Sequence, residues 1–486
     1  MINKKFEFEG RLLDMPRRGE HTCRMARIVT NGNRFTEVDD RPTSDQRDLL
    51  LMPPLANGHD HVRGVRPTAL GGFDLPLELW LTHMTNIPRV DPYLVAAAAL
   101  GRQALGGIGS MMIHYTRPRD RDRIGEELQV VAGAATDIGV RVALAVAMRD
   151  INPLGYGPDD QLLDELDASD KALIREKLIS APASPAEQIR FVEELATRIE
   201  SPLVNVQFGP YGVEWCSRPL LELIAERSAT TGRRVHMHLL ESRIQREYLD
   251  HVYPDGPILY LDKIGLLSPR LSVAHAVWIR PGEMELLAQR GVTVATNACS
   301  NLSLRSGMAP VAEMHGRGVP LAMGLDGFSI DDDDDAFREL RLNYLLHRGV
   351  GLDDGIPVSD LLHMCCYGGR HSVTGIVPGD GVAPAGPADL MVLDYGAISK
   401  DVIVAIDEAH LLARRATARI LKQLVVAGSE VVRDGKLLNL DLPGVHTELD
   451  RQVRHGASEF NAWQQVSARL RERLKRFYAA GLHHCG

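Results

Sequence analysis

The apolar run that begins at Leu49 ends in Ala56-Asn57-Gly58-His59-Asp60-His61, and seven more short apolar runs follow it along the chain. They occupy residues 109–114, 140–148, 203–208, 234–239, 271–275, 292–296 and 319–325. Stretches with helical spacing lie between them, at residues 93–105, 125–138, 185–199, 218–230, 244–252, 281–290 and 309–317. Strands that alternate with helices indicate a parallel sheet, and eight repeats fit a closed (β/α)8 TIM-type barrel better than an open sheet.

The two ends of the chain have a different pattern. Residues 1–48 and 388–440 contain short candidate strands with turn residues, including an Asp434-Gly435 hairpin turn. Because neither end alone holds enough apolar residues for a core, we expect residues 1–50 and 386–440 to form one small β-sandwich domain beside a barrel at 51–385. Residues 441–486 are predicted to form a C-terminal helical extension, whose charged helix at about 455–480 packs on the barrel or on a second subunit.

The composition is that of an ordinary globular protein. The chain has 486 residues, of which 44% are apolar and 24% charged, and 64 acidic residues against 55 basic ones give a net charge of −9. At roughly 150 residues per domain the length predicts about three domains. Because a single α/β barrel can use about 250 residues or more, we expect one large and one small domain instead. The acidic excess predicts no nucleic-acid or anionic-membrane partner, since both require a basic surface.

The sequence predicts neither a secretory signal nor a membrane-spanning segment. The first residues lack the apolar core of a secretory signal, and no stretch approaches the roughly 20 apolar residues that span a bilayer. Six cysteines form no CxxC pair and no regular framework. We therefore expect reduced thiols and a cytoplasmic location.

Histidines and one aspartate fall at the predicted strand ends. His59 and His61 are two residues apart, so on a strand both point to the same side. The carboxyl ends of barrel strands form the face on which such enzymes carry their catalytic groups. Imidazoles with one carboxylate suit a borderline divalent ion such as zinc, or iron. The strand-end residues are His59, His61, His236, His238, His275 and Asp326.

This constellation has the parts that hydrolysis requires. A bound cation brings the pKa of a water molecule close to neutrality. Asp326 can act as ligand and base together, and Glu241, three residues past His238, can carry a proton to a leaving amine. His275 can hold the attacking water or polarise the electrophile.

Side chains just past the strand ends are candidates for substrate contacts. Aromatic, guanidinium and amide groups can hold a flat polar heterocycle by stacking and hydrogen bonds, although each is equally compatible with an ordinary rim position. The acidic run Asp331–Asp335 either caps the helix that follows it or binds a substrate amine. The candidate contacts are Arg63, Arg66, Trp80, Gln207 and Tyr211.

Several longer motifs accompany the strand-end histidines. Residues 53–61 close with the HxH pair, His238-Leu239-Leu240-Glu241 is an HxxE motif, and Val273-Ala274-His275 follows it. Residues 300–310 read SNLSLRSGMAP, and residues 386–394 read GPADLMVLD. Together these motifs resemble the amidohydrolase superfamily, in the branch that contains atrazine chlorohydrolase, triazine hydrolases, guanine deaminase and S-adenosylhomocysteine deaminase.

The resemblance implies a particular ligand set. His59, His61, His238 and Asp326 hold one divalent ion, with Zn²⁺ expected and Fe²⁺ as the alternative, and Asn301 belongs to the substrate contacts. His236 is left as a neighbour of the ligands or a core residue. Relatives with two metals carry a bridging lysine on strand four, but residues 203–208 contain none, so a single ion is expected.

The resemblance also implies an activity. We expect a metal-dependent aminohydrolase that removes ammonia or an amine from a nitrogen heterocycle such as a purine, pterin, pyrimidine or s-triazine. Opening of a cyclic amide of the hydantoin or imidazolone kind is the alternative, and a non-catalytic metal-binding barrel is a third. The family and the charged C-terminal helix also predict a homo-oligomer, a dimer or a tetramer.

Overall fold

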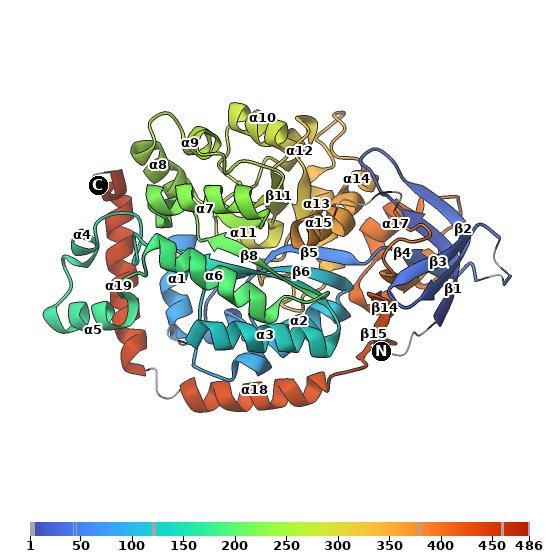
Figure 1. The fold of residues 1–486 in the computed structure, drawn as a ribbon, viewed down its shortest axis with the longest axis horizontal. Helices are drawn as coiled ribbons and strands as arrows, with labels where there is room; N and C mark the ends of the chain where they lie inside the picture. Colours follow the sequence, from blue (N-terminus) through green and yellow to red (C-terminus); the bar gives the residue numbers. More distant parts are fainter. Residues whose placement is uncertain are drawn as a thin grey trace.

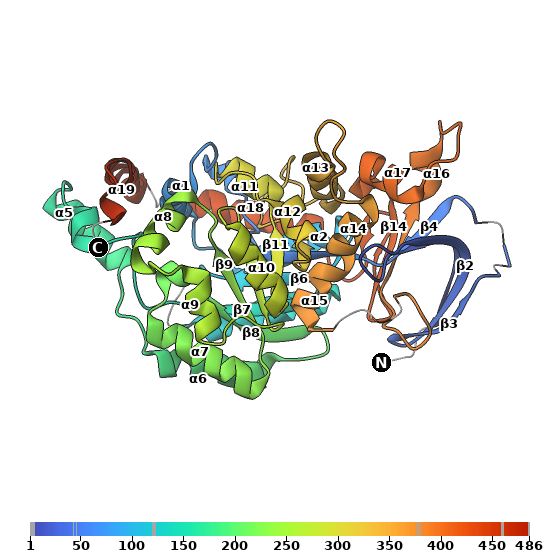
Figure 2. The same ribbon diagram turned by 90° about the horizontal axis from the view of Figure 1, so that it is seen from above.

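The computed structural model describes residues 5–41, 43–44, 46–118, 123–376, 379, 381–457 and 461–484. Two eight-stranded sheets lie side by side: a barrel surrounded by helices and a smaller sheet at one end of the molecule (Figures 1 and 2). The smaller sheet combines strands from the beginning of the chain with strands from its last quarter.

The barrel sheet has its strands in chain order, each parallel to the next. The backbone N–H of Asp326 donates to the carbonyl oxygen of His59 at 2.9 Å, which joins the end of the last strand to the end of the first. The predicted TIM-type barrel is confirmed. Its strands are β5 (Leu55–Asp60), β6 (Ile108–Tyr115), β7 (Arg141–Met148), β8 (Val204–Pro210), β9 (Val235–Leu239), β10 (Leu271–His275), β11 (Thr293–Thr296) and β12 (Leu321–Met323).

Helices cover the outside of the barrel, and the seven predicted stretches match them to within two residues at each end. Local signals mark such boundaries in the sequence. At the start of α6, Ser184 forms a capping box with Glu187, and Pro185 occupies the first helical position. The barrel helices are α2 (Pro92–Leu105), α3 (Ile124–Ile138), α6 (Pro185–Ile199), α7 (Arg218–Thr231), α8 (Arg243–Val252), α9 (Pro257–Lys263), α10 (Pro281–Arg290), α12 (Val311–Gly316), α13 (Ala336–His347), α14 (Val358–His363) and α15 (Gly369–Thr374).

The smaller sheet has the order β16-β15-β14-β13-β4-β1-β2-β3, and β13 pairs antiparallel with β4 to join the two ends of the chain. Side chains from both ends share one apolar cluster, which includes Phe8, Ile28, Leu390 and Val425. The boundaries of the two domains stay predictions. The strands are β1 (Lys5–Asp14), β2 (Thr22–Asn31), β3 (Arg34–Asp39), β4 (Leu49–Met52), β13 (Leu390–Asp394), β14 (Leu421–Val426), β15 (Ser429–Arg433) and β16 (Lys436–Leu437).

One predicted strand is in fact two. The run from Leu49 to Gly58 was expected to form a single barrel strand, but β4 belongs to the smaller sheet and only β5 to the barrel. Pro53 and Pro54 lie between them, and a proline has no N–H to continue a hydrogen-bond ladder. The predicted Asp-Gly hairpin does form between β15 and β16, with positive φ angles of 47° at Asp434 and 73° at Gly435.

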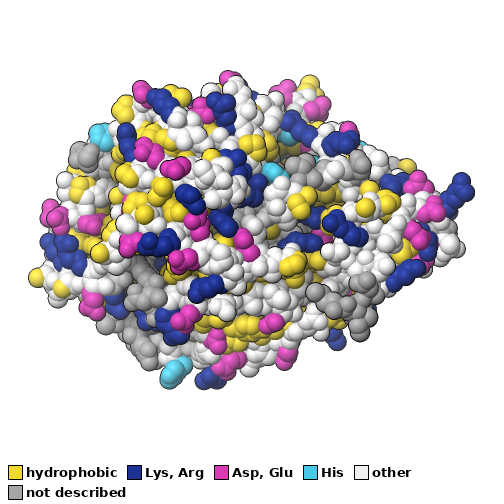
Figure 3. Space-filling view, in the orientation of Figure 1, with side chains coloured by type: hydrophobic (Ala, Val, Ile, Leu, Met, Phe, Trp, Pro, Cys, Tyr) yellow, Lys and Arg dark blue, Asp and Glu magenta, His cyan; other side chains and the backbone are white. Residues whose placement is uncertain are grey.

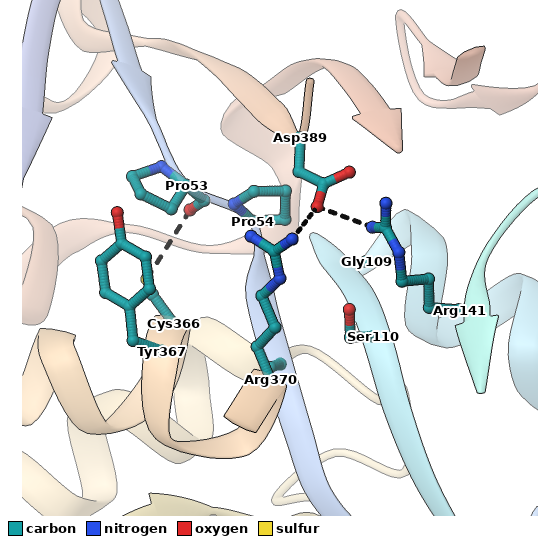
Figure 4. A pocket seen from close by; sticks show the side chains of 10 residues that line it. Pro53, Pro54, Gly109, Ser110, Arg141, Cys366, Tyr367, Arg370 and Asp389 are labelled. Carbon is teal, nitrogen blue, oxygen red and sulfur yellow. Dashed lines mark hydrogen bonds and ion pairs between the residues drawn. The ribbon is translucent and has the colours of Figure 1, made fainter. Parts of the chain in front are cut away.

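A buried ion-pair cluster ties the smaller sheet to the barrel. Arg141 at the start of β7 and Arg370 on α15 both point to Asp389, at 2.6 and 2.8 Å (Figure 4). The other oxygen of Asp389 accepts from the backbone N–H of Ala427 at 2.6 Å. Burial opposes ionisation of Asp389, but the two guanidinium groups outweigh it and lower its pKa.

The C-terminal segment forms α18 (Leu442–Ala457) and α19 (Asn461–Ala479), while residues 458–460 lie outside the described part. Helix α19 lies against α1 (Leu77–His83), α4 (Asp159–Leu163) and α5 (Ala168–Leu178), which follow the carboxyl ends of β5 and β7 (Figure 1). Arg469 pairs with Asp170 on α5 at 2.5 Å, and Leu470, Leu474 and Phe477 are buried. The predicted packing of this helix on the barrel is thus present.

The surface and the cysteines fit an ordinary globular chain. Lys and Arg side chains are interspersed with Asp and Glu over the face drawn in Figure 3. Cys23, Cys216, Cys299, Cys365 and Cys366 are free thiols, whereas Cys485 lies outside the described residues. Within the described ranges, no helix is both long and apolar enough to cross a membrane.

Candidate active site

Six histidines meet at the carboxyl ends of the barrel strands, and Asp326 joins them from the segment after β12. Neighbouring imidazole rings of this group have their centroids 4.7 to 6.3 Å apart. The five expected from the sequence are present, and a sixth, His114, comes from β6. The six are His59, His61, His114, His236, His238 and His275.

Two of these residues have left-handed backbone conformations. The φ angle is 75° at His275 and 55° at Asp326, both directly at or after a strand end. A non-glycine residue in this region costs free energy, and such residues concentrate at functional sites. The positive φ angles turn the backbone sharply at His275, the last residue of β10, and at Asp326, just after β12.

The predicted ligands converge on one point. The Nε2 atom of His61 lies 3.1 Å from Oδ1 of Asp326 and 3.3 Å from Nε2 of His238. The Nε2 atom of His59 lies 3.4 Å from the same carboxylate oxygen and is buried without a hydrogen-bond partner. A converging set of imidazole nitrogens and one carboxylate, with a buried nitrogen left unpartnered, fits a divalent cation.

Hydrogen bonds to the other ring nitrogens aim these imidazoles at the centre. Nδ1 of His61 donates to the carbonyl oxygen of His114 at 2.6 Å, and Nδ1 of His238 donates to that of Tyr211 at 2.6 Å. Nδ1 of His59 lies 2.7 Å from Nε2 of His236, as expected for a neighbour of the ligands. With Nδ1 occupied, Nε2 is the nitrogen available to a metal.

Electrostatics keep the nitrogens neutral and the carboxylate charged. Burial lowers the pKa of His59 and of His238 well below the ordinary value, which favours the neutral imidazole that binds metals. Burial opposes ionisation of Asp326, but Arg63 and the neighbouring imidazoles hold its pKa well below the usual range. Oδ2 of Asp326 also accepts from the Ser300 hydroxyl at 2.5 Å.

Glu241 and His275 lie together beside the ligand set. Oε2 of Glu241 is 3.5 Å from Nε2 of His275, and Nδ1 of His275 is 2.8 Å from Oδ1 of Asn301. Burial, with the charge of Asp326 next, raises the pKa of Glu241 well above its ordinary value. A carboxyl group that keeps its proton at neutral pH can donate that proton to a reacting atom.

Sequence reasoning missed His114. Its ring stacks on that of His238 at a centroid distance of 4.7 Å, its Nε2 donates to the Gly209 carbonyl at 3.0 Å, and its own carbonyl orients His61. Like the others it lies at the end of a barrel strand, so its position in the predicted strand 109–114 was the available signal.

Four of the predicted substrate contacts lie near this centre. The guanidinium of Arg63 contacts Asp326 and stacks 4.9 Å from the Trp80 ring. Asn301 contacts His275, and Tyr211 supplies the carbonyl that orients His238. Arg63, Asn301 and Tyr211 therefore contact members of the histidine and aspartate cluster directly, whereas Trp80 contacts Arg63.

The structure does not bring Gln207 and Arg66 to the centre. The Gln207 amide donates to the carbonyl oxygen of Ser372 on α15 at 3.0 Å, inside the barrel. Arg66 pairs with Asp334 at 2.8 Å. In the same acidic run, Asp335 caps α13 by accepting from the Phe337 N–H at 3.0 Å, which agrees with the helix-capping interpretation.

Comparison with known proteins assigns the chain to the family that its sequence motifs resemble. Residues 50–431 match the amidohydrolase family. A 5-methylthioadenosine/S-adenosylhomocysteine deaminase of Nitratidesulfovibrio vulgaris is 33% identical over 438 residues, which cover 89% of each chain. A 5′-deoxyadenosine deaminase of Methanothermobacter thermautotrophicus is 26% identical over 442 residues, covering 84% of this chain and 92% of the relative.

Solved structures share the fold. An adenosine deaminase from Xanthomonas campestris with bound zinc has a TM-score of 0.75 at 22% identity, covering 93% of this chain and 98% of that one. A triazine hydrolase variant has a TM-score of 0.77 at 21% identity, covering 92% and 99%. The chain belongs to the amidohydrolase family and is a hydrolase, as the sequence motifs predicted.

Proposed function

We propose that this hydrolase is an aminohydrolase, which releases ammonia or an amine from a purine-like nitrogen heterocycle with the help of one divalent metal ion. The observation that carries the proposal is the buried pair of Glu241 and His275 beside the ligand set of His59, His61, His238 and Asp326. A purely structural metal site needs no such pair.

The metal assignment follows from the donor set. When bound, a divalent ion supplies a water molecule that is nucleophilic at neutral pH. Zinc is proposed because imidazole-rich sites suit it and because the adenosine deaminase from Xanthomonas campestris holds zinc. A single ion is proposed because the inner part of β8 carries Asn205 and Gln207 and no lysine.

The residues divide the proton transfers between them. Asp326, ionised and held by Ser300, is positioned to accept the proton of the attacking water. Glu241, protonated because it is buried, donates to a ring nitrogen or to the departing amine. Nε2 of His275 is buried, has no hydrogen-bond partner and lies 3.5 Å from Glu241, so it is available to hold the water or the developing charge.

The relatives support the choice of a heterocyclic amine. Curated relatives that match most of the chain are deaminases of 5′-deoxyadenosine, or of 5-methylthioadenosine and S-adenosylhomocysteine. We therefore place an adenine-type ring first among the substrates expected from the sequence. A cytoplasmic location and assembly into a dimer or tetramer stay predictions.

The test is ammonia release from 5′-deoxyadenosine by zinc-loaded and iron-loaded protein, followed together with the absorbance of the ring. Deamination changes the ring absorbance and keeps the ring closed, whereas ring opening abolishes it. His238→Ala should lose bound metal, measured by elemental analysis. Glu241→Gln should keep the metal and lose at least a hundredfold in kcat. Full activity of Glu241→Gln would contradict the proton-transfer assignment.

A further inference from the structure

A second cluster of possible metal ligands lies outside the active site, where the turn after α19 meets α8. This turn is the 3-10 helix Leu482–His484, and it packs against α8 near the marked carboxyl end of the chain (Figures 1 and 2). Helix α8 contributes Glu247, and the turn contributes His483 and His484. Glu247 and His483 are 236 positions apart in the sequence, so the fold brings them together and no local pattern does.

The three side chains converge on one carboxylate oxygen. Nε2 of His483 lies 3.2 Å and Nε2 of His484 lies 3.7 Å from Oε2 of Glu247. One ligand atom from each residue lies within 4.8 Å of the other two, as in the groups formed by the active-site histidines. Two bonds of about 2.0–2.1 Å to a tetrahedral zinc ion place their donor atoms about 3.3 Å apart. The observed separations from Glu247 are therefore close to those of a zinc site.

Neighbouring groups hold these side chains in place. The other oxygen of Glu247, Oε1, pairs with Nε of Arg243 one turn earlier in α8 at 3.3 Å, which leaves Oε2 for the imidazoles. The His483 side chain is 2% exposed, and its ring packs edge-on against Tyr478 at a centroid distance of 5.6 Å. The His484 side chain is 46% exposed. A cation can therefore reach the cluster from solvent, and a water molecule can complete its coordination.

Such groups of three are uncommon in the described part of the chain. Every other described group of three histidine, cysteine or acidic side chains with ligand atoms this close consists of active-site residues. His315 illustrates the ordinary case, because its imidazole contacts Asp360 at 2.8 Å and has Arg18 beside it. The second imidazole at Glu247 distinguishes this cluster from such a pair of one histidine and one carboxylate.

We propose that Glu247, His483 and His484 form a second divalent-metal site, which takes up zinc and fastens the turn after α19 to α8. The site shares no residue with the ligand set at the barrel mouth, and it takes no part in the proposed hydrolysis, which uses the single ion there. Two imidazoles and one carboxylate are ligands that zinc accepts, and water fills the fourth position. Metal binding stabilises the closed turn, because the three ligands lie together only when the turn is docked on α8.

Equilibrium dialysis against zinc near neutral pH, followed by elemental analysis, counts the ions on each protein. We expect two ions per wild-type chain, one at the active site and one at this cluster. His484→Ala, and Glu247→Gln, which keeps the shape of the side chain, should each bind the second ion at least tenfold more weakly. The matched control is His315→Ala, which removes an imidazole paired with one carboxylate and should keep both ions. A wild-type chain that holds only one ion in excess zinc, or a second ion that persists in both variants, overturns the site.

The His238→Ala variant separates this site from the proposed function. It should lose the active-site ion and keep the ion at Glu247, and its combination with His484→Ala should remove both. If His238→Ala keeps both ions, the ligand set of the proposed function fails. The second site is then still judged by whether His484→Ala loses one ion.

Hydrogen exchange tests whether the ion fastens the turn. The backbone N–H of His484 donates to the Gly481 carbonyl oxygen at 3.1 Å, so its exchange reports opening of the turn. Zinc at a hundred times the dissociation constant of this site should slow that exchange about a hundredfold in the wild-type protein. Glu247→Gln should abolish the effect. Exchange that zinc slows equally in both proteins, or in neither, contradicts the fastening role.

Discussion

Replacing Glu339 by Gln should stabilise the protein at neutral pH and leave it unchanged in acid. Glu339 lies on α13 with 1% of its surface exposed, and one of its oxygens accepts from the Cys299 N–H at 3.2 Å, at the start of α11 (Ala298–Ser303). Burial raises the pKa of Glu339 from 4.5 to about 8. An amide keeps the acceptor oxygen but has no proton to lose.

The magnitude follows from linkage between protonation and folding. Below pH 4.5 Glu339 is protonated in both the folded and the unfolded chain. Its protonation therefore does not affect the free energy of unfolding in this range. As the pH rises, the unfolded chain releases the proton and the folded one keeps it, and stability falls by about 1.4 kcal/mol per pH unit until the folded pKa is reached. At pH 7 the loss amounts to roughly 3 kcal/mol, which Glu339→Gln should recover.

The assay is the thermal midpoint of both proteins from pH 4.5 to 8.5, with the same divalent metal present throughout. The difference between them should be near zero at pH 4.5, grow through neutrality and level off above pH 8. A matched control is Glu187→Gln in the capping box of α6, where Ser184 lowers the pKa of an exposed glutamate. There the sign reverses: the variant should lose stability above pH 4.5 and match the wild type in acid. A difference for Glu339→Gln that is negative at pH 7, or constant with pH, would refute the reasoning.

Three further outcomes are expected. Ser300→Ala removes the hydroxyl that donates to Asp326 at 2.5 Å, so kcat should fall about tenfold while metal content, by elemental analysis, stays the same. Gly428→Ala should destabilise the folded state by more than about 1 kcal/mol in denaturant titrations, because φ is 72° there and a Cβ would overlap the carbonyl oxygen of Gly32. Chelation should lower the thermal midpoint, and metal at a hundred times its dissociation constant should restore about 2.7 kcal/mol; an unchanged midpoint would speak against a metal held by His59 and its neighbours.

Much of the fold could be predicted from local patterns. A strand in a barrel is buried on both faces, so it reads as an apolar run, and Ser184 followed by Pro185 shows where a helix begins. The division of residues 49–58 into two strands was harder, because the apolar run continues on both sides of Pro53 and Pro54. Which sheet each half joins depends on partners in β1, β13 and β6 that are distant in the sequence.

Only part of the candidate site could be predicted from local sequence patterns. Strand-end histidines converge because all parallel strands of a barrel end on the same face. This convergence can be predicted without knowing any contacts between residues. Gln207 lies inside the barrel, three residues before the end of β8, because this strand continues to Pro210 and not only to Phe208. Arg66 pairs with Asp334, 268 positions further along the chain, and no local pattern reveals such a partner.

Contacts between the barrel strands orient the proposed metal ligands. His61 follows β5 but is oriented by the carbonyl of His114 on β6, and His238 on β9 is oriented by the carbonyl of Tyr211 just past β8. His59 in turn is oriented by His236, which Ser272 on β10 holds at 2.8 Å. Because each of these imidazoles takes its direction from a residue on or just past another strand, their geometry depends on how the strands are placed relative to one another. A core substitution that shifts one strand by a few tenths of an ångström should therefore weaken metal binding without touching any ligand.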